Sequence, residues 1–289
     1  MNKILKILVT GANGQLGQEL RLKSKKSKNN FFFTDVDDLN ILDSEELEKK
    51  VIEYSPDVIV NCAAFTAVDT AETQQEEASA INYQAVRQIA NIAARKNIKI
   101  VHISTDYVFD GCSYVPYNED HNPNPLSVYG YTKLQGERAL IESGCDGVII
   151  RTSWLYSNFG KNFYKSIERI SKTQNEINVV FDQVGTPTYA GDLADAIIYI
   201  IPQLDTIFGI EVYHYSNEGA CSWYDFANAV VKALGLSTKI YPIHTDEFPT
   251  DAQRPFYSIL DKSKIKNAFG IEINHWQESL INCVRERNS

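Results

Sequence analysis

The feature that most constrains the fold is an apolar run that leads directly into a glycine-rich one near the N-terminus. Residues 4–9 read ILKILV, residues 11–17 read GANGQLG, and residues 18–23 (QELRLK) favour a helix. A strand, a glycine turn and a helix in this order are typical of a dinucleotide site, where the helix N-terminus holds a pyrophosphate. We expect this turn to supply a set of cofactor contacts, namely Gly11, Asn13, Gly14, Gln15, Leu16 and Gly17.

Apolar strands and helical patterns then alternate as far as about residue 154. Strands are predicted at 29–35, 56–64, 98–104 and 146–154, and helices at 44–54, 76–96 and 131–143. Continuous apolar strands separated by helices predict an α/β, Rossmann-like, doubly wound parallel sheet that is covered on both faces. We therefore expect a dinucleotide-binding domain over 1–152, joined by late strands near 178–181 and 211–215. Residues 153–289 would form mostly a smaller, C-terminal substrate-binding lobe.

Bulk composition excludes several classes of function. The chain has 289 residues and a net charge of −9, which argues against binding to nucleic acid or to an anionic membrane. No apolar run approaches the roughly 18 residues of a membrane span, and the N-terminus lacks a signal-peptide pattern. Five cysteines without CxxC pairing favour reduced thiols and a cytoplasmic location.

The segment after the second predicted strand is strongly acidic. Residues 35–38 read DVDD, with no lysine or arginine among them. The Asp35 carboxylate can accept hydrogen bonds from adenosine ribose hydroxyls, and it would repel a 2′-phosphate. The sequence therefore predicts NADH as the preferred cofactor and NADPH as the less favoured one, with Asn40 and Ile41 flanking the adenine.

The segment VYGYTK, residues 128–133, holds two tyrosines and a lysine. If a helix begins here, Tyr129 and Lys133 share one face, with Cβ atoms about 5–6 Å apart. Tyr131 and Lys133 are about 200° apart around the helix axis, so they cannot readily serve one site. An isolated YxxxK is more often a surface pair, but the glycine motif upstream favours an acid–base centre for a carbonyl. We expect the cation to lower the pKa of Tyr129 toward neutrality.

A hydroxyl group at the end of the fourth predicted strand can polarise the same carbonyl oxygen. Strand alternation places Thr105 on the face opposite Ser104, and we favour Thr105, with helix capping as the alternative role. His102 lies within the apolar strand and is interpreted as a core histidine. The five histidines have no paired metal-ligand spacing, and the sequence has no GxSxG elbow.

Together these segments resemble the extended short-chain dehydrogenase/reductases, and most closely their dTDP-4-dehydrorhamnose reductase group. The resemblance runs through nearly the whole chain. The matching segments are GANGQLG (11–17), PDVIVNCAAFTAVDTAE (56–72), STDYVFDG (104–111), YGYTK (129–133), RTSWLY (151–156), NF (162–163), DQVGTPT (182–188) and RP..S.LD (254–261). It implies reduction of the C4 ketone of dTDP-4-dehydro-L-rhamnose to dTDP-L-rhamnose, a precursor of surface polysaccharide.

The resemblance also implies roles for individual positions. Thr105, Tyr129 and Lys133 would form the catalytic set, with Lys133 also bonding the nicotinamide ribose. Further cofactor contacts would be Ala63, Ala64 and Phe65. Besides Thr105 and Tyr129, the implied substrate contacts are Val68, Asp106, Trp154, Asn162 and Arg254.

Four of these substrate contacts also have purely structural interpretations. Asp106 would order its loop, Trp154 would pack in the core, Asn162 would cap a helix, and Arg254 would form a surface ion pair. The sequence alone leaves both interpretations open for each residue.

One departure from the family pattern concerns a metal. Some similar bacterial proteins bind Mg²⁺ at a dimer contact through a glutamate shortly after the GxPT segment, whereas residues 189–192 here read YAGD. We therefore predict no required metal, and a homodimer is only one possible assembly.

Two other functions remain open. One is a nucleotide-sugar epimerase or 4,6-dehydratase of the same fold. A dehydratase would place an Asp-Glu pair after the threonine, but Asp106 and Tyr107 follow Thr105. A non-catalytic regulatory subunit need not keep Thr105, Tyr129 and Lys133 together.

Overall fold

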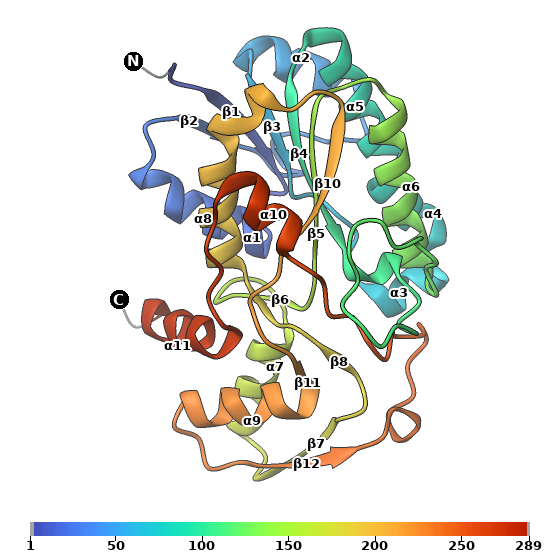
Figure 1. The fold of residues 1–289 in the computed structure, drawn as a ribbon, viewed down its shortest axis with the longest axis vertical. Helices are drawn as coiled ribbons and strands as arrows, with labels where there is room; N and C mark the ends of the chain where they lie inside the picture. Colours follow the sequence, from blue (N-terminus) through green and yellow to red (C-terminus); the bar gives the residue numbers. More distant parts are fainter. Residues whose placement is uncertain (1–2, 288–289) are drawn as a thin grey trace.

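Six parallel strands form the central sheet of the computed structural model, which describes residues 3–287 (Figure 1). In spatial order they are β10 (Ile210–His214), β5 (Gly147–Thr152), β4 (Lys99–Thr105), β3 (Val58–Asn61), β1 (Lys6–Thr10) and β2 (Asn30–Phe33). Every neighbouring pair is parallel. The chain leaves β1 for β2 on one side and continues from β3 on the other, which creates the switch point where such sheets bind ligands.

Helices cover both faces of this sheet. One face carries α1 (Gln15–Lys23), α8 (Ala190–Ile200) and α10 (Ser263–Phe269), and the other carries α2 (Ser44–Tyr54), α5 (Val86–Lys96) and α6 (Val128–Glu142). Along β1, Ile7 and Val9 enter the first of these cores while Leu8 enters the second, because successive strand residues face opposite sides. The fold is thus the Rossmann-like, doubly wound α/β sheet that the alternating sequence predicts.

The predicted helix over 76–96 is interrupted. The chain forms α3 (Val68–Thr73) and α4 (Gln75–Ser79), then a wide π-helical segment (Ala80–Ala85), and only then α5. In this segment the buried Asn82 exchanges hydrogen bonds with the backbone of Phe65 and donates to the Thr132 hydroxyl. The distortion therefore ties the loop after β3 to α6.

The smaller lobe lies beyond the carboxyl ends of the strands (Figure 1). Its core joins α7 (Phe163–Ser171), α9 (Trp223–Ala233) and α11 (Trp276–Arg287). Three two-stranded pairs complete it, namely β6 (Leu155–Tyr156) with β9 (Thr188–Tyr189), β7 (Glu176–Val180) with β12 (Lys239–Ile243), and β8 (Val184–Gly185) with β11 (Cys221–Ser222).

The two strands predicted late in the sequence belong to different sheets. The strand expected near 211–215 is β10, the edge strand of the central sheet. The strand expected near 178–181 is β7, which pairs with β12 in the smaller lobe, so placing it in the main sheet was wrong. Its alternating exposure suits a strand with only one buried face, unlike the fully buried β3 and β5. None of the helices described over residues 3–287 is long and apolar enough to cross a membrane.

Candidate active site

A cavity of about 1140 Å³ opens between the sheet and the smaller lobe. Its lining comes from the strand ends of the central sheet and from α7, β7 and the chain near residues 248–254. Nearly all of the predicted site residues line it; within the described chain the exceptions are Asn13 and Phe65, whose backbone amides bond Asp35 and Asn82. Residues far apart in the sequence thus meet at the switch point of the sheet.

The glycine turn packs so closely against neighbouring backbone that a side chain would collide at two of its positions. Gly11 has φ +67°, and a Cβ there would lie 2.6 Å from the backbone nitrogen of Ala63. A Cβ on Gly17 would lie 2.4 Å from the carbonyl oxygen of Gly11. Because α1 begins at Gln15 with no side-chain cap, its first-turn amides are available to a phosphate.

Asp35 connects the glycine turn to the end of β2. Its carboxylate accepts the amide hydrogens of Asn13 over 2.7 Å and of Val36 over 2.8 Å. Asn40 and Ile41 lie beside it in the cavity lining. The carboxylate therefore lies in the cavity wall beside the glycine turn.

The α6 helix sets the geometry of the reaction centre. Ser127 accepts the amide hydrogen of Gly130, so α6 begins at Val128, three residues before the predicted start. Tyr129 therefore lies in the first turn and faces the cavity together with Lys133. Tyr131 is 52% exposed and its hydroxyl accepts from Gln135, so it lies outside the site.

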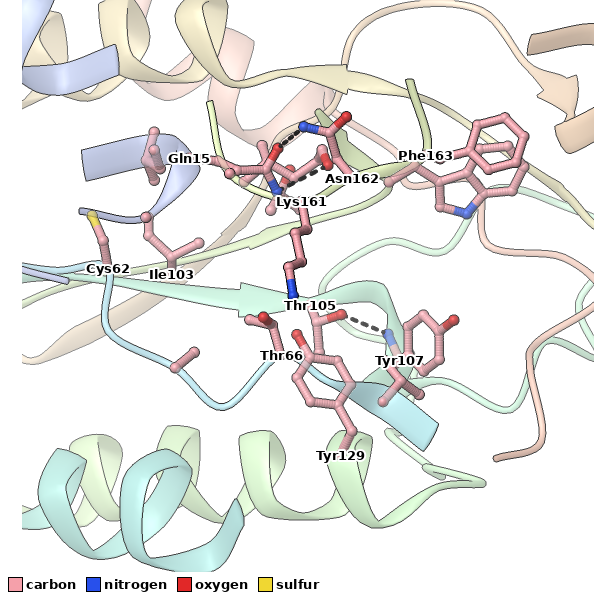
Figure 2. A pocket seen from close by; sticks show the side chains of 18 of the residues that line it. Gln15, Cys62, Thr66, Ile103, Thr105, Tyr107, Tyr129, Lys161, Asn162 and Phe163 are labelled. Carbon is pink, nitrogen blue, oxygen red and sulfur yellow. Dashed lines mark hydrogen bonds between the residues drawn. The ribbon is translucent and has the colours of Figure 1, made fainter. Parts of the chain in front are cut away.

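Thr105 meets Tyr129 from the end of β4. Figure 2 shows the Tyr129 hydroxyl directed toward Thr105. The Thr105 hydroxyl accepts the amide hydrogen of Tyr107 over 3.2 Å and donates to Asp106 over 3.1 Å. Ser104 also lines the cavity, with its buried hydroxyl lacking a partner among residues 3–287, so strand alternation alone does not decide between the two hydroxyls.

The electrostatics at Tyr129 differ from the prediction. Burial raises the pKa of its phenol to about 12 rather than lowering it. Lys133 does not offset this effect of burial in the structure, because its Nζ donates to the carbonyl oxygen of Ile103 over 2.6 Å and lies 3.4 Å from His102 Nε2. Burial also lowers the pKa of Lys133 to about 8. Tuning of Tyr129 by the lysine therefore requires the ammonium group to turn from Ile103 toward the phenol.

Asp106 is a buried acid beside the reaction centre. It is 2% exposed, and its Oδ2 has no hydrogen-bond partner among the described residues by distance and angle criteria. Burial raises its pKa to about 7, partly offset by hydroxyl groups of Ser258 and Thr105. Tyr107 occupies the next position and packs edge-on against Tyr129, with ring centroids 5.5 Å apart. The position that carries a glutamate in the dehydratases thus holds an aromatic ring here.

The outer end of the cavity is aromatic. Trp154, at φ +46°, stacks on Trp223 with ring centroids 3.5 Å apart and planes 7° apart. Phe163 packs next to Trp223 at 4.6 Å. Trp223 was missed in the sequence because it lies 69 residues from Trp154 and belongs to no recognisable motif. The side chain of Lys161, also missed, extends into the cavity from the loop before α7 (Figure 2).

Arg254 faces the cavity while it holds an ion pair. Its guanidinium donates to both carboxylate oxygens of Asp69, over 2.7 and 3.0 Å. Val68, which precedes Asp69, lines the same part of the cavity. Both interpretations of Arg254 are thus compatible with its position.

Asn162 caps α7 and links the lobes. Its Oδ1 accepts the amide hydrogen of Lys165 over 2.9 Å. Its Nδ2 lies 2.8 Å from Gln15 Oε1 and within 3.1 Å of the carbonyl oxygens of Ser157 and Phe159 (Figure 2). The helix-cap role is therefore present, and the amide nitrogen is already occupied by protein acceptors.

The segment that departs from the family pattern takes part in packing. Asp192 accepts hydrogen bonds from Asn217 and Ser279, and Tyr189 is buried. Over residues 3–287, no group of three or more histidine, cysteine, aspartate or glutamate side chains could hold a metal ion.

Known proteins are similar to this chain in sequence and in fold. Residues 5–289 match the family model described as RmlD substrate binding domain. The spore coat polysaccharide biosynthesis protein SpsK of Bacillus subtilis is 40% identical over 284 residues, covering 98% of each chain. A dTDP-4-dehydrorhamnose reductase of Aggregatibacter actinomycetemcomitans is 39% identical over 288 residues, covering 96% of this chain and 97% of its own. A crystal structure of dTDP-4-dehydrorhamnose reductase from Bacillus anthracis with NADP superposes with a TM-score of 0.93, at 36% identity and with 98% of this chain and 100% of that chain covered.

Proposed function

We propose, from the premise that this chain belongs to the RmlD substrate-binding-domain family, that it is a nicotinamide-dependent reductase of dTDP-4-dehydro-L-rhamnose. The observation that carries the proposal is the meeting of Thr105, Tyr129 and Lys133 with the open glycine turn at one cavity. The relatives named as reductases of this sugar nucleotide are similar over nearly their whole length, which favours the same reaction here.

Each side chain at the centre has a definite task in this reaction. The reduced nicotinamide, when bound, supplies a hydride to C4 of the keto sugar. Tyr129 gives its phenol proton to the oxygen at C4. Thr105 turns its hydroxyl from Asp106 to the same oxygen and stabilises the developing charge. Lys133 holds the cofactor ribose and, as an ammonium group, favours the phenolate that Tyr129 becomes. The product is dTDP-L-rhamnose.

The test uses two tyrosines of one helix. We expect Tyr129→Phe to lower kcat by about 10²–10⁴-fold, because it removes the general acid, while NADH binding is retained. Tyr131→Phe is the matched control, since that hydroxyl is exposed and bonds only Gln135 among the described residues. NADH oxidation with dTDP-4-dehydro-L-rhamnose and related 4-keto sugar nucleotides measures both. Wild-type turnover by Tyr129→Phe would refute the assignment.

The preferred cofactor is NADH in this proposal. Asp35 is held by two backbone amides at the end of β2, and residues 36–38 supply no cation for a 2′-phosphate. The Bacillus anthracis relative, by contrast, was solved with NADP. Comparison of kcat/KM for NADH and NADPH decides the point, and a clear preference for NADPH would contradict the proposal.

We place this reaction in the cytoplasm, where dTDP-sugars are made and thiols stay reduced. The five cysteines are all free, which supports a reducing compartment. The substrate is the expected partner, and neither nucleic acid nor a metal is required. A homodimer stays a prediction that light scattering of the purified protein would test.

A further inference from the structure

A buried chain of polar side chains runs from β1 to Lys133. The Thr10 hydroxyl donates to Asn61 Oδ1 over 2.7 Å. Asn61 Nδ2 lies 3.1 Å from His102 Nδ1, and His102 Nε2 lies 3.4 Å from Lys133 Nζ. Each of the four residues has at most 1% of its surface exposed. Each donor in this row of side chains must therefore face an acceptor, because bulk water cannot reach a donor or acceptor that lacks a partner.

A backbone amide fixes the orientation of the Asn61 side chain. The amide hydrogen of Ala63 is donated to Asn61 Oδ1 over 3.2 Å, and a backbone nitrogen can only donate. The oxygen of Asn61 therefore faces Ala63 and Thr10, and its NH₂ group faces His102. His102 Nδ1 must accept this hydrogen bond, so a neutral imidazole carries its single proton on Nε2.

The Nε2 proton points at Lys133. An ammonium group has only donors, so it would meet this N–H as donor against donor, whereas a neutral amine can accept it. We propose that His102, which Asn61 holds in one tautomer, is a positioning residue for Lys133. It favours the neutral amine of Lys133 beside the carbonyl oxygen of Ile103. When Lys133 is protonated, His102 favours the orientation in which the ammonium group faces Tyr129. The inference rests on the proposed role of Lys133.

Two other titratable groups face Lys133 from the strand and helix around it. Cys62 follows β3, and burial raises the pKa of its thiol to about 12, so it is neutral at pH 7. Glu137 lies one turn further along α6, where Arg151 binds both of its oxygens over 2.7 to 3.2 Å. Arg151 thus balances the charge of Glu137, and the remaining attraction of Glu137 for the ammonium group opposes the larger effect of burial on the Lys133 pKa.

The pKa values of His102 and Lys133 are consistent with a lysine that is protonated at neutral pH beside a neutral histidine. Burial lowers the pKa of Lys133 to about 8 and holds that of His102 well below its ordinary value. His102 therefore stays neutral while Lys133 changes its charge near pH 8. Tyr129, one turn before the lysine, gains a cationic neighbour only while Lys133 is protonated.

NMR spectroscopy of the whole 289-residue chain shows the tautomer of His102 directly. Uniform ¹⁵N labelling and long-range ¹H–¹⁵N correlation of the five histidine rings distinguish Nε2–H from Nδ1–H, and His102→Gln assigns the signal. We expect the Nε2–H form of His102 between pH 6 and 9. An Nδ1–H form would overturn the proposal. Because this measurement needs no turnover, its failure is distinguishable from failure of the proposed reaction.

The pH profile tests the effect on Lys133. In His102→Gln the glutamine side-chain oxygen can accept a hydrogen bond from the Lys133 ammonium group and so stabilise the protonated lysine. The basic limb of the plot of kcat/KM against pH should therefore move up by about one pH unit or more. His214→Gln is the matched control. His214 is a buried histidine of β10, two strands away from His102 in the sheet, and it bonds Arg151 and Tyr117, so the basic limb of this variant's pH profile should not move. Loss of activity in His102→Gln at every pH, with the limb unmoved, would reduce His102 to a packing role and overturn the proposal.

A second variant covers the case in which His102→Gln does not fold. Asn61→Asp places a carboxylate oxygen opposite His102 Nδ1, which favours the Nδ1–H tautomer and leaves Nε2 free to accept from the ammonium group. We expect a reversed tautomer in the ¹⁵N spectrum and the same upward movement of the basic limb. An unchanged tautomer would overturn the proposed control by Asn61.

Discussion

Replacing Asn162 with serine or alanine separates the two roles that its position allows, support of the fold and contact with the sugar nucleotide. Serine keeps an acceptor for the amide of Lys165 and removes the Nδ2 donor that faces Gln15, Ser157 and Phe159. Alanine removes both. The difference between the two variants therefore isolates the helix cap, and the loss common to both gives the contribution of the Nδ2 hydrogen bonds.

The magnitudes follow from the hydrogen bonds of Asn162. A lost helix cap costs about 1 kcal/mol. The two Nδ2 hydrogens contribute about 1 kcal/mol each, because their acceptors are part-buried. Asn162→Ser should thus lower the free energy of unfolding by about 2 kcal/mol, and Asn162→Ala by about 3 kcal/mol. At about 2–4 °C per kcal/mol, the serine variant should melt about 4–8 °C lower.

Urea unfolding and steady-state kinetics measure these effects together. Loss of the bond to Gln15, the first residue of α1, should also raise KM for NADH by up to about fivefold. Ser222→Ala is the matched control, since it removes the cap of α9 and has no bond to the cofactor turn. If Asn162→Ser keeps wild-type stability and raises only KM for the sugar nucleotide, Asn162 is a substrate contact and the reasoning is wrong.

Two further predictions concern buried charges. Glu137→Gln leaves the Arg151 guanidinium, 5% exposed, without its carboxylate, so it should lower the free energy of unfolding by about 3–5 kcal/mol in urea; a loss below about 1 kcal/mol would contradict this account. Burial raises the pKa values of Asp106 and Glu19 to about 7, so each takes up a proton on folding between about pH 4 and pH 7, and the free energy of unfolding should fall as the pH rises through that range. Asp106→Asn and Glu19→Gln should each flatten this part of the stability curve, whereas an unchanged curve in both would show that neither acid is responsible.

Local pattern was enough to predict the sheet and many of the residues that line the cavity. Alternation of apolar strands and helices predicts the doubly wound architecture, because a strand buried on both faces must be apolar throughout. The placement of β7 failed since a five-residue strand carries no information about its partner. The partner strand β12 lies more than 60 residues further along the chain, and no local period encodes a contact over that separation.

The sequence by itself determined the elements of the site that depend on spacing within one segment. The glycine turn before α1 and the one-turn separation of Tyr129 from Lys133 are of this kind, because helix and turn geometry fix them locally. Only the tertiary structure decided where Lys133 directs its amine and what Trp154 stacks on. Those outcomes, and the raised pKa of Tyr129, arise from burial among residues of other segments, and burial is a property of the packed chain.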